Sequence, residues 1–435
     1  MRKSFAVMAT PKLRDLAALR TRPTRLWTLA AGCALLATAC GDDSDSKQDK
    51  LDDAPAMLEN YAAILYAGYD DSVTSAKAMQ SALAPLTDGS VTSESFEAAR
   101  QAWRVARVPY QQTEFGRFYN GPIDDPETGN VEGMINPWPL DEATIDYVSG
   151  SDGAPLFGGV INMTSEYPDI SAQVLSQDNM VPGEENVTTG YHAIEFLLWG
   201  QDFNPDGAGD RSFQDYIAGD QENVDRRQTY LSVATQLLID QLTQVRDAWA
   251  ENAENYRKTF LADPKASLGL VLTGMGKFAS GELANQRINT AYTSKDQENE
   301  HSCFSDNTNA DLMDDVLGLS NLYYGHYTRL DGSVVSGASL SDLVKARDEA
   351  LDAQVRAQVD QALADIRAWP LAAQCPSAAL QGNCPFDQLM LGTNDAPGRQ
   401  ALAKVIADLR DLGSSVVRIA DLFGIQIDIS DSGEQ

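Results

Sequence analysis

Apolar residues recur at intervals of three and four along much of the chain, which is the period of one face of an α-helix. The clearest examples are residues 231–249, 351–369 and 402–423. Pro264, Pro370 and Gly424 follow these three segments, and proline and glycine are typical just beyond the end of a helix. Alternating strand patterns between tight turns are scarce. The pattern therefore predicts an all-α fold.

Further amphipathic segments complete the expected set of helices. They cover residues 57–83, 96–118, 188–200 and 268–293. Helices with one apolar stripe pack most simply as antiparallel bundles, and a chain of 435 residues has room for two. Turn-forming residues cluster in 200–219, where we expect the boundary. Residues 120–159 carry five prolines and form a connection long enough to suggest a functional loop.

The N-terminus has the layout of an export signal. The first 25 residues carry seven Lys and Arg side chains, and an apolar run from Leu26 to Ala39 follows. This run is shorter than the roughly 20 residues of a membrane-spanning helix. It ends in small residues before Cys40, which resembles a lipobox and predicts cleavage before Cys40 and acylation of its thiol. An ordinary signal peptide cut after Ala39 is the alternative.

These features divide the chain into four parts. They are a signal peptide (1–39), an acylated cysteine with a polar tether (40–54), a folded domain (55–425, with halves of about 55–205 and 206–425) and a tail (426–435). The lipid on Cys40 would hold the domain at a bilayer. We therefore expect an exported bacterial lipoprotein that is held at a membrane of the cell envelope.

The chain is strongly acidic. Its formal net charge is −30, from 63 acidic and 33 basic residues. Such a surface repels polyanions, which argues against a nucleic-acid partner. It is compatible with attracting cations, although high negative charge also serves solubility alone.

Five cysteines are present. Cys33 lies in the signal and Cys40 is the predicted lipidation site, which leaves Cys303, Cys375 and Cys384 in the folded part. An export compartment permits disulfides, and a Cys375–Cys384 bond would close the loop between two Cys-Pro pairs. Cys303 would then be unpaired.

The segment 188–200 carries the most informative pair of polar residues. Its two threonines can cap a helix and Gly200 can end it. Within that helix His192 and Glu195 share one face, because residues three apart are neighbours. The spacing resembles the Glu-x-x-His pairs of metal-binding bundles and predicts half of a metal site. A structural hydrogen bond between the two side chains inside a bundle explains the same spacing.

Two other segments hold candidate ligands. Residues 298–306 bring His301 and Cys303 close to several carboxylates. Cys303 can be a soft metal ligand, a nucleophile activated by His301, or a buried inert thiol. Glu282 can belong to a site or pair with a nearby cation.

A polar face on the helix 96–118 carries Arg100, Arg104, Arg107 and Glu114. Such a face is usually solvated. Alternatively, it binds a carboxylate or orients Glu114 toward the centre of the protein, with residues 137–142 covering the same cleft.

At Gly190-Tyr191-His192-Ala193-Ile194-Glu195 the sequence resembles the Gly-x-His-x-x-Glu motif of the imelysin family. The continuation to Asp202 is similar to the iron-regulated branch of that family. Four further segments match in the expected order, at residues 121–124, 136–142, 281–284 and 301–306. The resemblance covers about residues 55–425. It implies two packed four-helix-bundle-like halves and a cleft near the histidine motif. It also implies an envelope lipoprotein associated with iron supply, at the outer membrane and facing the periplasm or the cell surface.

The resemblance leaves three functions open. In the preferred one, the protein binds iron or a metal-linked ligand, with His192 and Glu195 as ligands. Their candidate partners across the cleft are Glu114, Glu282, His301 and Cys303. In the second, the same pair holds zinc in a metallopeptidase, although the chain lacks the His-Glu-x-x-His helix that would supply two histidines. In the third, the cleft binds another envelope protein without a metal.

Overall fold

The computed structural model describes residues 51–430, except residues 52, 152, 205–206, 220–221 and 370–384. The predicted signal peptide, the lipidation site Cys40 and the predicted Cys375–Cys384 disulfide lie outside the described residues. None of the helices in the described part of the chain combines the length and apolarity needed to cross a bilayer.

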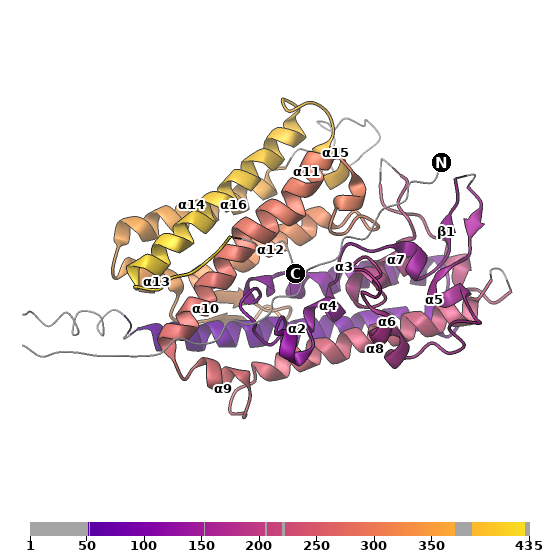
Figure 1. Cartoon of the computed structure of the whole chain (residues 1–435), viewed down its shortest axis with the longest axis horizontal. Coiled ribbons are helices and arrows are strands. Elements are labelled where there is room, and N and C mark those ends of the chain that lie inside the picture. The colour runs from indigo at the N-terminus through magenta and orange to yellow at the C-terminus, as the bar shows by residue number, and fades with distance from the viewer. Residues whose placement is uncertain are drawn as a thin grey trace, which may run out of the picture. The chain divides into compact units, whose positions relative to one another are not determined.

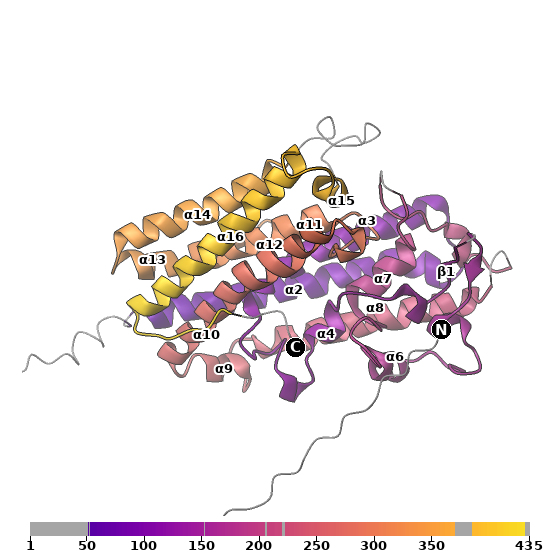
Figure 2. The same cartoon turned by 45° about the horizontal axis from the view of Figure 1, so that its top comes forward.

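Four helices from the first part of the chain pack together. They are α2 (Ala54–Thr87), α3 (Ser93–Gln111), α7 (Gly190–Trp199) and α8 (Val224–Ala248). Helix α2 packs against both α3 and α8, and Figures 1 and 2 show α2 and α8 side by side. The short helix α7 contacts α3 and α8. Leu65, Trp103, Leu198 and Leu238 are fully buried between these helices.

A second set of helices comes from the later part of the chain. It comprises α10 (Pro264–Gly276), the π-helix η5 (Lys277–Asn289), α11 (Thr290–Ser294), α12 (Thr308–Tyr324), α14 (Glu349–Arg367) and α16 (Pro397–Leu422). Helix α16 packs against α10, η5 and α14, and Figures 1 and 2 show α14 beside α16. Helix α12 contacts both α14 and α3, which joins the two sets. The predicted all-α fold with two bundle-like sets of helices is confirmed.

Between α3 and α7 the described residues form only short elements, and the predicted irregular region, 120–159, lies within this stretch. They are η1 (Glu114–Gly116), η2 (Pro126–Thr128), α4 (Glu132–Ile135), η3 (Glu142–Thr144), β1 (Val148–Ser149), β2 (Pro155–Leu156), α5 (Gly159–Asn162) and α6 (Ala172–Asp178). Strands β1 and β2 pair antiparallel, with Val148 opposite Leu156. Helices α4, α5 and α6 all contact α8, so this region lies on the first set of helices.

Short elements also connect the helices that follow α7. They are η4 (Phe213–Tyr216), α9 (Tyr256–Phe260), η6 (Gln297–Asn299), β3 (His326–Thr328), β4 (Val334–Ser336), α13 (Leu340–Lys345) and α15 (Phe386–Met390). Strands β3 and β4 form an antiparallel hairpin with Tyr327 opposite Val335.

One predicted helix end is wrong. Pro264 does not follow the end of the helix that contains residues 231–249, because α8 stops at Ala248 and α9 intervenes. Pro264 is instead the first residue of α10, whose N-cap Asp263 accepts a hydrogen bond from the Ala266 amide. At a first helical position the missing N–H of proline removes no intrahelical hydrogen bond.

Candidate functional site

Helix α7 carries the His192–Glu195 pair into the interior of the protein. All ten of its residues are buried. Gly200 ends the helix with φ +72°, as predicted, and Thr189 occupies the N-cap position. A threonine therefore occupies the N-cap position, as predicted, but among the described residues its side chain makes no capping hydrogen bond, and the Thr188 hydroxyl donates to the Leu175 carbonyl.

His192 and Glu195 bind each other. A hydrogen bond of 2.7 Å joins His192 Nδ1 and Glu195 Oε2, and both side chains are fully buried. The second carboxyl oxygen of Glu195 accepts from the Ser305 amide at 3.0 Å and from the Ser305 hydroxyl at 2.7 Å. Both oxygens of Glu195 are therefore occupied, and the pair ties α7 to the segment before α12.

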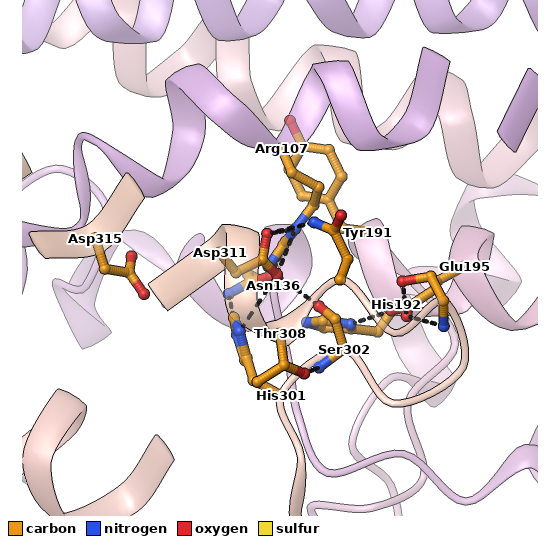
Figure 3. A network of polar contacts seen from close by, with 12 residues as sticks. Arg107, Asn136, Tyr191, His192, Glu195, His301, Ser302, Thr308, Asp311 and Asp315 are labelled. Atoms are coloured by element: carbon orange, nitrogen blue, oxygen red, sulfur yellow. Dashed lines mark hydrogen bonds and ion pairs between the residues drawn. The ribbon is translucent and has the colours of Figure 1, made fainter. Parts of the chain in front are cut away.

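His301 lies next to this pair but has different partners. The two imidazole centroids are 5.0 Å apart. The side-chain oxygen of Asn136 accepts a hydrogen bond from Arg107. The side-chain nitrogen of Asn136 is therefore the atom that faces His301 Nε2, at 3.2 Å. That nitrogen of His301 must therefore be an acceptor, which places the ring proton on Nδ1, 3.5 Å from an Asp311 oxygen. Figure 3 shows these contacts.

A buried ion pair between Arg107 and Asp311 lies beside His301, on the side of its Nδ1 atom. Arg107 donates to both carboxylate oxygens of Asp311, with its shortest contact at 2.8 Å. Asp311 also accepts from the Ser302 hydroxyl at 2.6 Å and from the Asn307 amide at 2.9 Å. Burial opposes ionisation, yet the Arg107 guanidinium and these donors hold the pKa of Asp311 well below its usual range. The expectation of a solvated arginine face is therefore wrong at Arg107, which binds a carboxylate.

Glu114 and Glu282 belong to a second polar cluster centred on Arg287. Its guanidinium contacts Glu282 at 2.8 Å, Asp315 at 2.9 Å and Glu114. Glu114 also accepts from Arg117 at 2.7 Å. The pairing of Glu282 with a nearby cation is thus the arrangement observed.

The π-helix η5 places three of its charged side chains on the side that faces the cleft. In a π-helix, hydrogen bonds run between residues five apart, and such segments are frequent at functional sites. Lys277, Glu282 and Arg287 are spaced by five residues within η5, and all three line the same cleft. An ordinary α-helix would turn residues at this spacing to different sides.

The cleft has a volume of about 1080 Å³. Its walls come from the irregular region, η5 and the segment before α12. They include Arg117, Glu132, Asn136, Trp138, Lys277, Glu282, Arg287 and His301. Trp138 also lies against His192, with 5.1 Å between ring centroids. The expectation that residues 137–142 cover the site therefore agrees with the position of Trp138.

Cys303 is a buried thiol. Only 2% of the residue is exposed, and it has no disulfide partner among the described residues. Burial and the nearby Glu195 carboxyl group raise the pKa of this thiol well above its usual value. Because the thiolate is the reactive and metal-binding form, the structure favours the inert interpretation over the nucleophile or the soft ligand.

The predicted donors do not fit a preformed metal centre. Glu195 is occupied by His192 and Ser305, and His301 Nε2 accepts from Asn136. Glu114 and Glu282 pair with Arg287. No group of three or more His, Cys, Asp or Glu side chains has the geometry to hold a metal ion within the described ranges. His192 Nε2 is buried and has no hydrogen-bond partner among the described residues, so it is the one metal-binding atom of the predicted pair that is not already occupied there.

One buried carboxyl group, Glu195, and two half-buried ones, Glu132 and Asp306, predict an unusual dependence of stability on pH. Burial raises the pKa of Glu195 to about 8, that of Glu132 to about 7 and that of Asp306, which also faces Asp387 and Asp202, to about 8. The folded protein then retains protons that the unfolded chain releases, so the free energy of unfolding falls as pH rises. Burial lowers the pKa of both His192 and His301. These histidines make stability rise with pH, but only up to the ordinary histidine pKa of about 6.5, above which both states are neutral.

We therefore expect the free energy of unfolding to fall between about pH 6.5 and about pH 8. Urea unfolding across this range measures the slope, and Asp306→Asn should make it shallower. Asparagine tolerates the φ of +54° at this position and removes only the ionisable group. A slope that is unchanged in Asp306→Asn, or a wild-type stability that rises with pH, contradicts the prediction.

The fold and site together define a class: a mostly helical protein with a buried His–Glu pair beside a polar cleft. The imelysin family model matches residues 65–416, and the chain belongs to this family. It is 25% identical over 364 residues to iron-regulated protein A of Synechococcus elongatus, covering 79% of this chain and 82% of that protein.

Two solved structures share the fold. One is from Parabacteroides distasonis and is described as an iron-regulated protein A precursor. It has a TM-score of 0.61 and 16% identity, covering 85% of this chain and 95% of its own. The other is an imelysin-like protein of Psychrobacter arcticum with a TM-score of 0.53 and 12% identity, covering 85% and 96%.

Proposed function

We propose that this protein is an envelope lipoprotein that binds a small metal-linked ligand, an iron chelate, in the cleft beside the histidine motif. The N-terminal signal layout and Cys40 support the envelope location. The name of the relative, iron-regulated protein A, supports a link to iron. The binding role rests on the cleft.

Cleft size is the observation that carries the proposal. Its volume of about 1080 Å³ is far more than one ion needs. Sites for small molecules typically measure about 300–1,000 Å³. A chelated metal also brings its own ligands, which suits a cleft whose nearby carboxylates and imidazoles are already paired.

The cleft contains a cation for the anionic groups of a chelate. Lys277 lines it, and its charge interacts with the exposed Asp428 near the end of the described chain. Its ammonium group can donate three hydrogen bonds to ligand carboxylates. Metallopeptidase chemistry has less support, because a catalytic zinc normally takes three protein ligands. Of the His192–Glu195 pair, only His192 Nε2 is without a hydrogen-bond partner among the described residues, so the pair offers a single ligand atom.

Calorimetric titration of the full-length protein in detergent tests the proposal. We expect saturable binding of ferric citrate, and much weaker binding of citrate alone or of ferrous ion under anaerobic conditions. Lys277→Gln should weaken ferric citrate binding by about two- to fivefold, the range for one partly exposed charge pair. Absence of ferric citrate binding, or tighter binding of the bare ion, contradicts the proposal.

A further inference from the structure

We infer that Gly190, His192 and Glu195 form a structural lock that holds two walls of the cleft in place, and that neither the imidazole nor the carboxyl group contacts the ligand. The Gly-x-His-x-x-Glu motif thereby positions Trp138 and His301, which line the cleft. The effect on ligand affinity rests on the proposed function, whereas the effect on the two walls does not.

The first contact of the lock is the close approach of Gly190 to the segment before Trp138. A Cβ atom on Gly190 would lie 2.5 Å from the Ile135 carbonyl oxygen and 2.9 Å from the Pro137 side chain. Only a residue without a side chain lets the two backbones approach this closely. Gly190 therefore seats the segment 135–138 against α7.

Glu195 makes the second contact. Its Oε1 accepts both hydrogen bonds from Ser305, a residue 110 positions further along the chain. These bonds join α7 to the segment 301–305, which begins with His301. They need an acceptor oxygen at this point, but they do not need a negative charge.

His192 connects the two contacts. It bonds Glu195 through Nδ1, and its ring packs edge-on against both Trp138 and His301, at 5.1 and 5.0 Å between centroids. Phe304 packs against Trp138 as well, at 5.8 Å. The imidazole therefore lies in contact with residues from both cleft walls.

The same geometry keeps the motif side chains away from the ligand. His192 and Glu195 are fully buried, and the cleft lining includes neither of them. Figure 3 shows the His192–Glu195 hydrogen bond, and it also shows His301 joined to Asn136 and Asp311 instead. Buried partners that orient the residues of a site commonly change its affinity by about 10- to 100-fold when mutated.

The variant Glu195→Gln separates a lock from a ligand. Glutamine keeps an oxygen for Ser305, and its amide can donate to His192 Nδ1 if the imidazole takes its other tautomer. The lock therefore survives this change. A carboxylate that bound a metal would lose its charge and most of its affinity.

The experiment compares the full-length protein with Glu195→Gln, Glu195→Ala and His192→Ala. Hydrogen exchange is followed in peptides covering residues 135–139 and 301–307, and ferric citrate affinity is measured in parallel. We expect Glu195→Gln to resemble the unaltered protein in both. Glu195→Ala and His192→Ala should speed exchange in both segments and weaken binding by about tenfold or more.

Loss of binding in Glu195→Gln without faster exchange would overturn the inference, because the carboxylate would then act on the ligand directly. Unchanged exchange in His192→Ala and Glu195→Ala would overturn it as well. If the unaltered protein binds no ferric citrate, the proposed function fails while the exchange measurements still test the lock. If an alanine variant does not fold, Glu195→Gln still distinguishes the two roles.

Discussion

Asp311→Ala is expected to lower the free energy of unfolding by about 3–5 kcal/mol, because it leaves the Arg107 guanidinium buried without its counter-ion. Both side chains are 1% exposed. The substitution also removes the acceptor for Ser302 and Asn307. Chemical denaturation followed by circular dichroism measures the loss.

Two further variants give this prediction its controls. Asp247→Ala breaks a surface ion pair with Arg246, in which the Asp247 side chain is 60% exposed. It should change the free energy of unfolding by only about 0–1 kcal/mol. The double variant Arg107→Met with Asp311→Leu removes both buried charges and should recover much of the loss. A loss in Asp311→Ala no larger than in Asp247→Ala would contradict the prediction.

The same ion pair makes stability sensitive to acid. The folded-state pKa of Asp311 lies below the value in the unfolded chain, so its contribution is present at neutral pH and is lost as pH falls toward the folded value. The raised carboxyl pKa values act in the opposite direction above neutrality. Carboxyl groups with a lowered pKa and carboxyl groups with a raised pKa therefore limit stability from the two sides of the pH range.

Much of the fold was predictable because the long helices bury one regular apolar stripe. The apolar pattern did not predict helix α12, because three of its buried residues are aspartates: Asp311, Asp314 and Asp315. In the hydrophobic pattern of a sequence, a buried carboxylate cannot be distinguished from one on the surface. It becomes explicable only when its distant partner is known, and Arg107 is 204 residues away from Asp311.

The site was predictable in part. Spacing placed His192 and Glu195 on one face of a helix, and the observed hydrogen bond follows from it. Spacing did not reveal that Ser305 completes the environment of Glu195, since that contact depends on tertiary packing. Asn136, which binds both Arg107 and His301, was missed as an individual residue although it lies in the family-like segment 136–142.

The π-helix shows a different limit. Helical period alone predicts a helix across residues 268–293, but it does not distinguish a four-residue from a five-residue hydrogen-bond register. The available signal was polar residues five apart at Lys277, Glu282 and Arg287. Their convergence on the cleft connects the register of this helix to the chemistry of the site.

Gly190→Ala should be among the most damaging small substitutions in the chain. A side chain at φ +81° costs about 1–2 kcal/mol in strain. The new Cβ atom would also meet the Ile135 carbonyl oxygen at 2.5 Å, and relieving such an overlap costs about 1–3 kcal/mol more. We expect a combined loss of about 2–5 kcal/mol, measured by chemical denaturation.

Gly332→Ala is the matched control for this variant. Gly332 has nearly the same φ, +83°, but nothing lies within 4 Å of the position its Cβ would take. Its loss should therefore reflect strain alone, and the difference between the two variants measures how tightly segment 135–137 is seated on α7. Faster hydrogen exchange at residues 135–139 should accompany Gly190→Ala only. Equal losses and unchanged exchange would show that the glycine of the motif serves the start of the helix rather than the wall of the cleft.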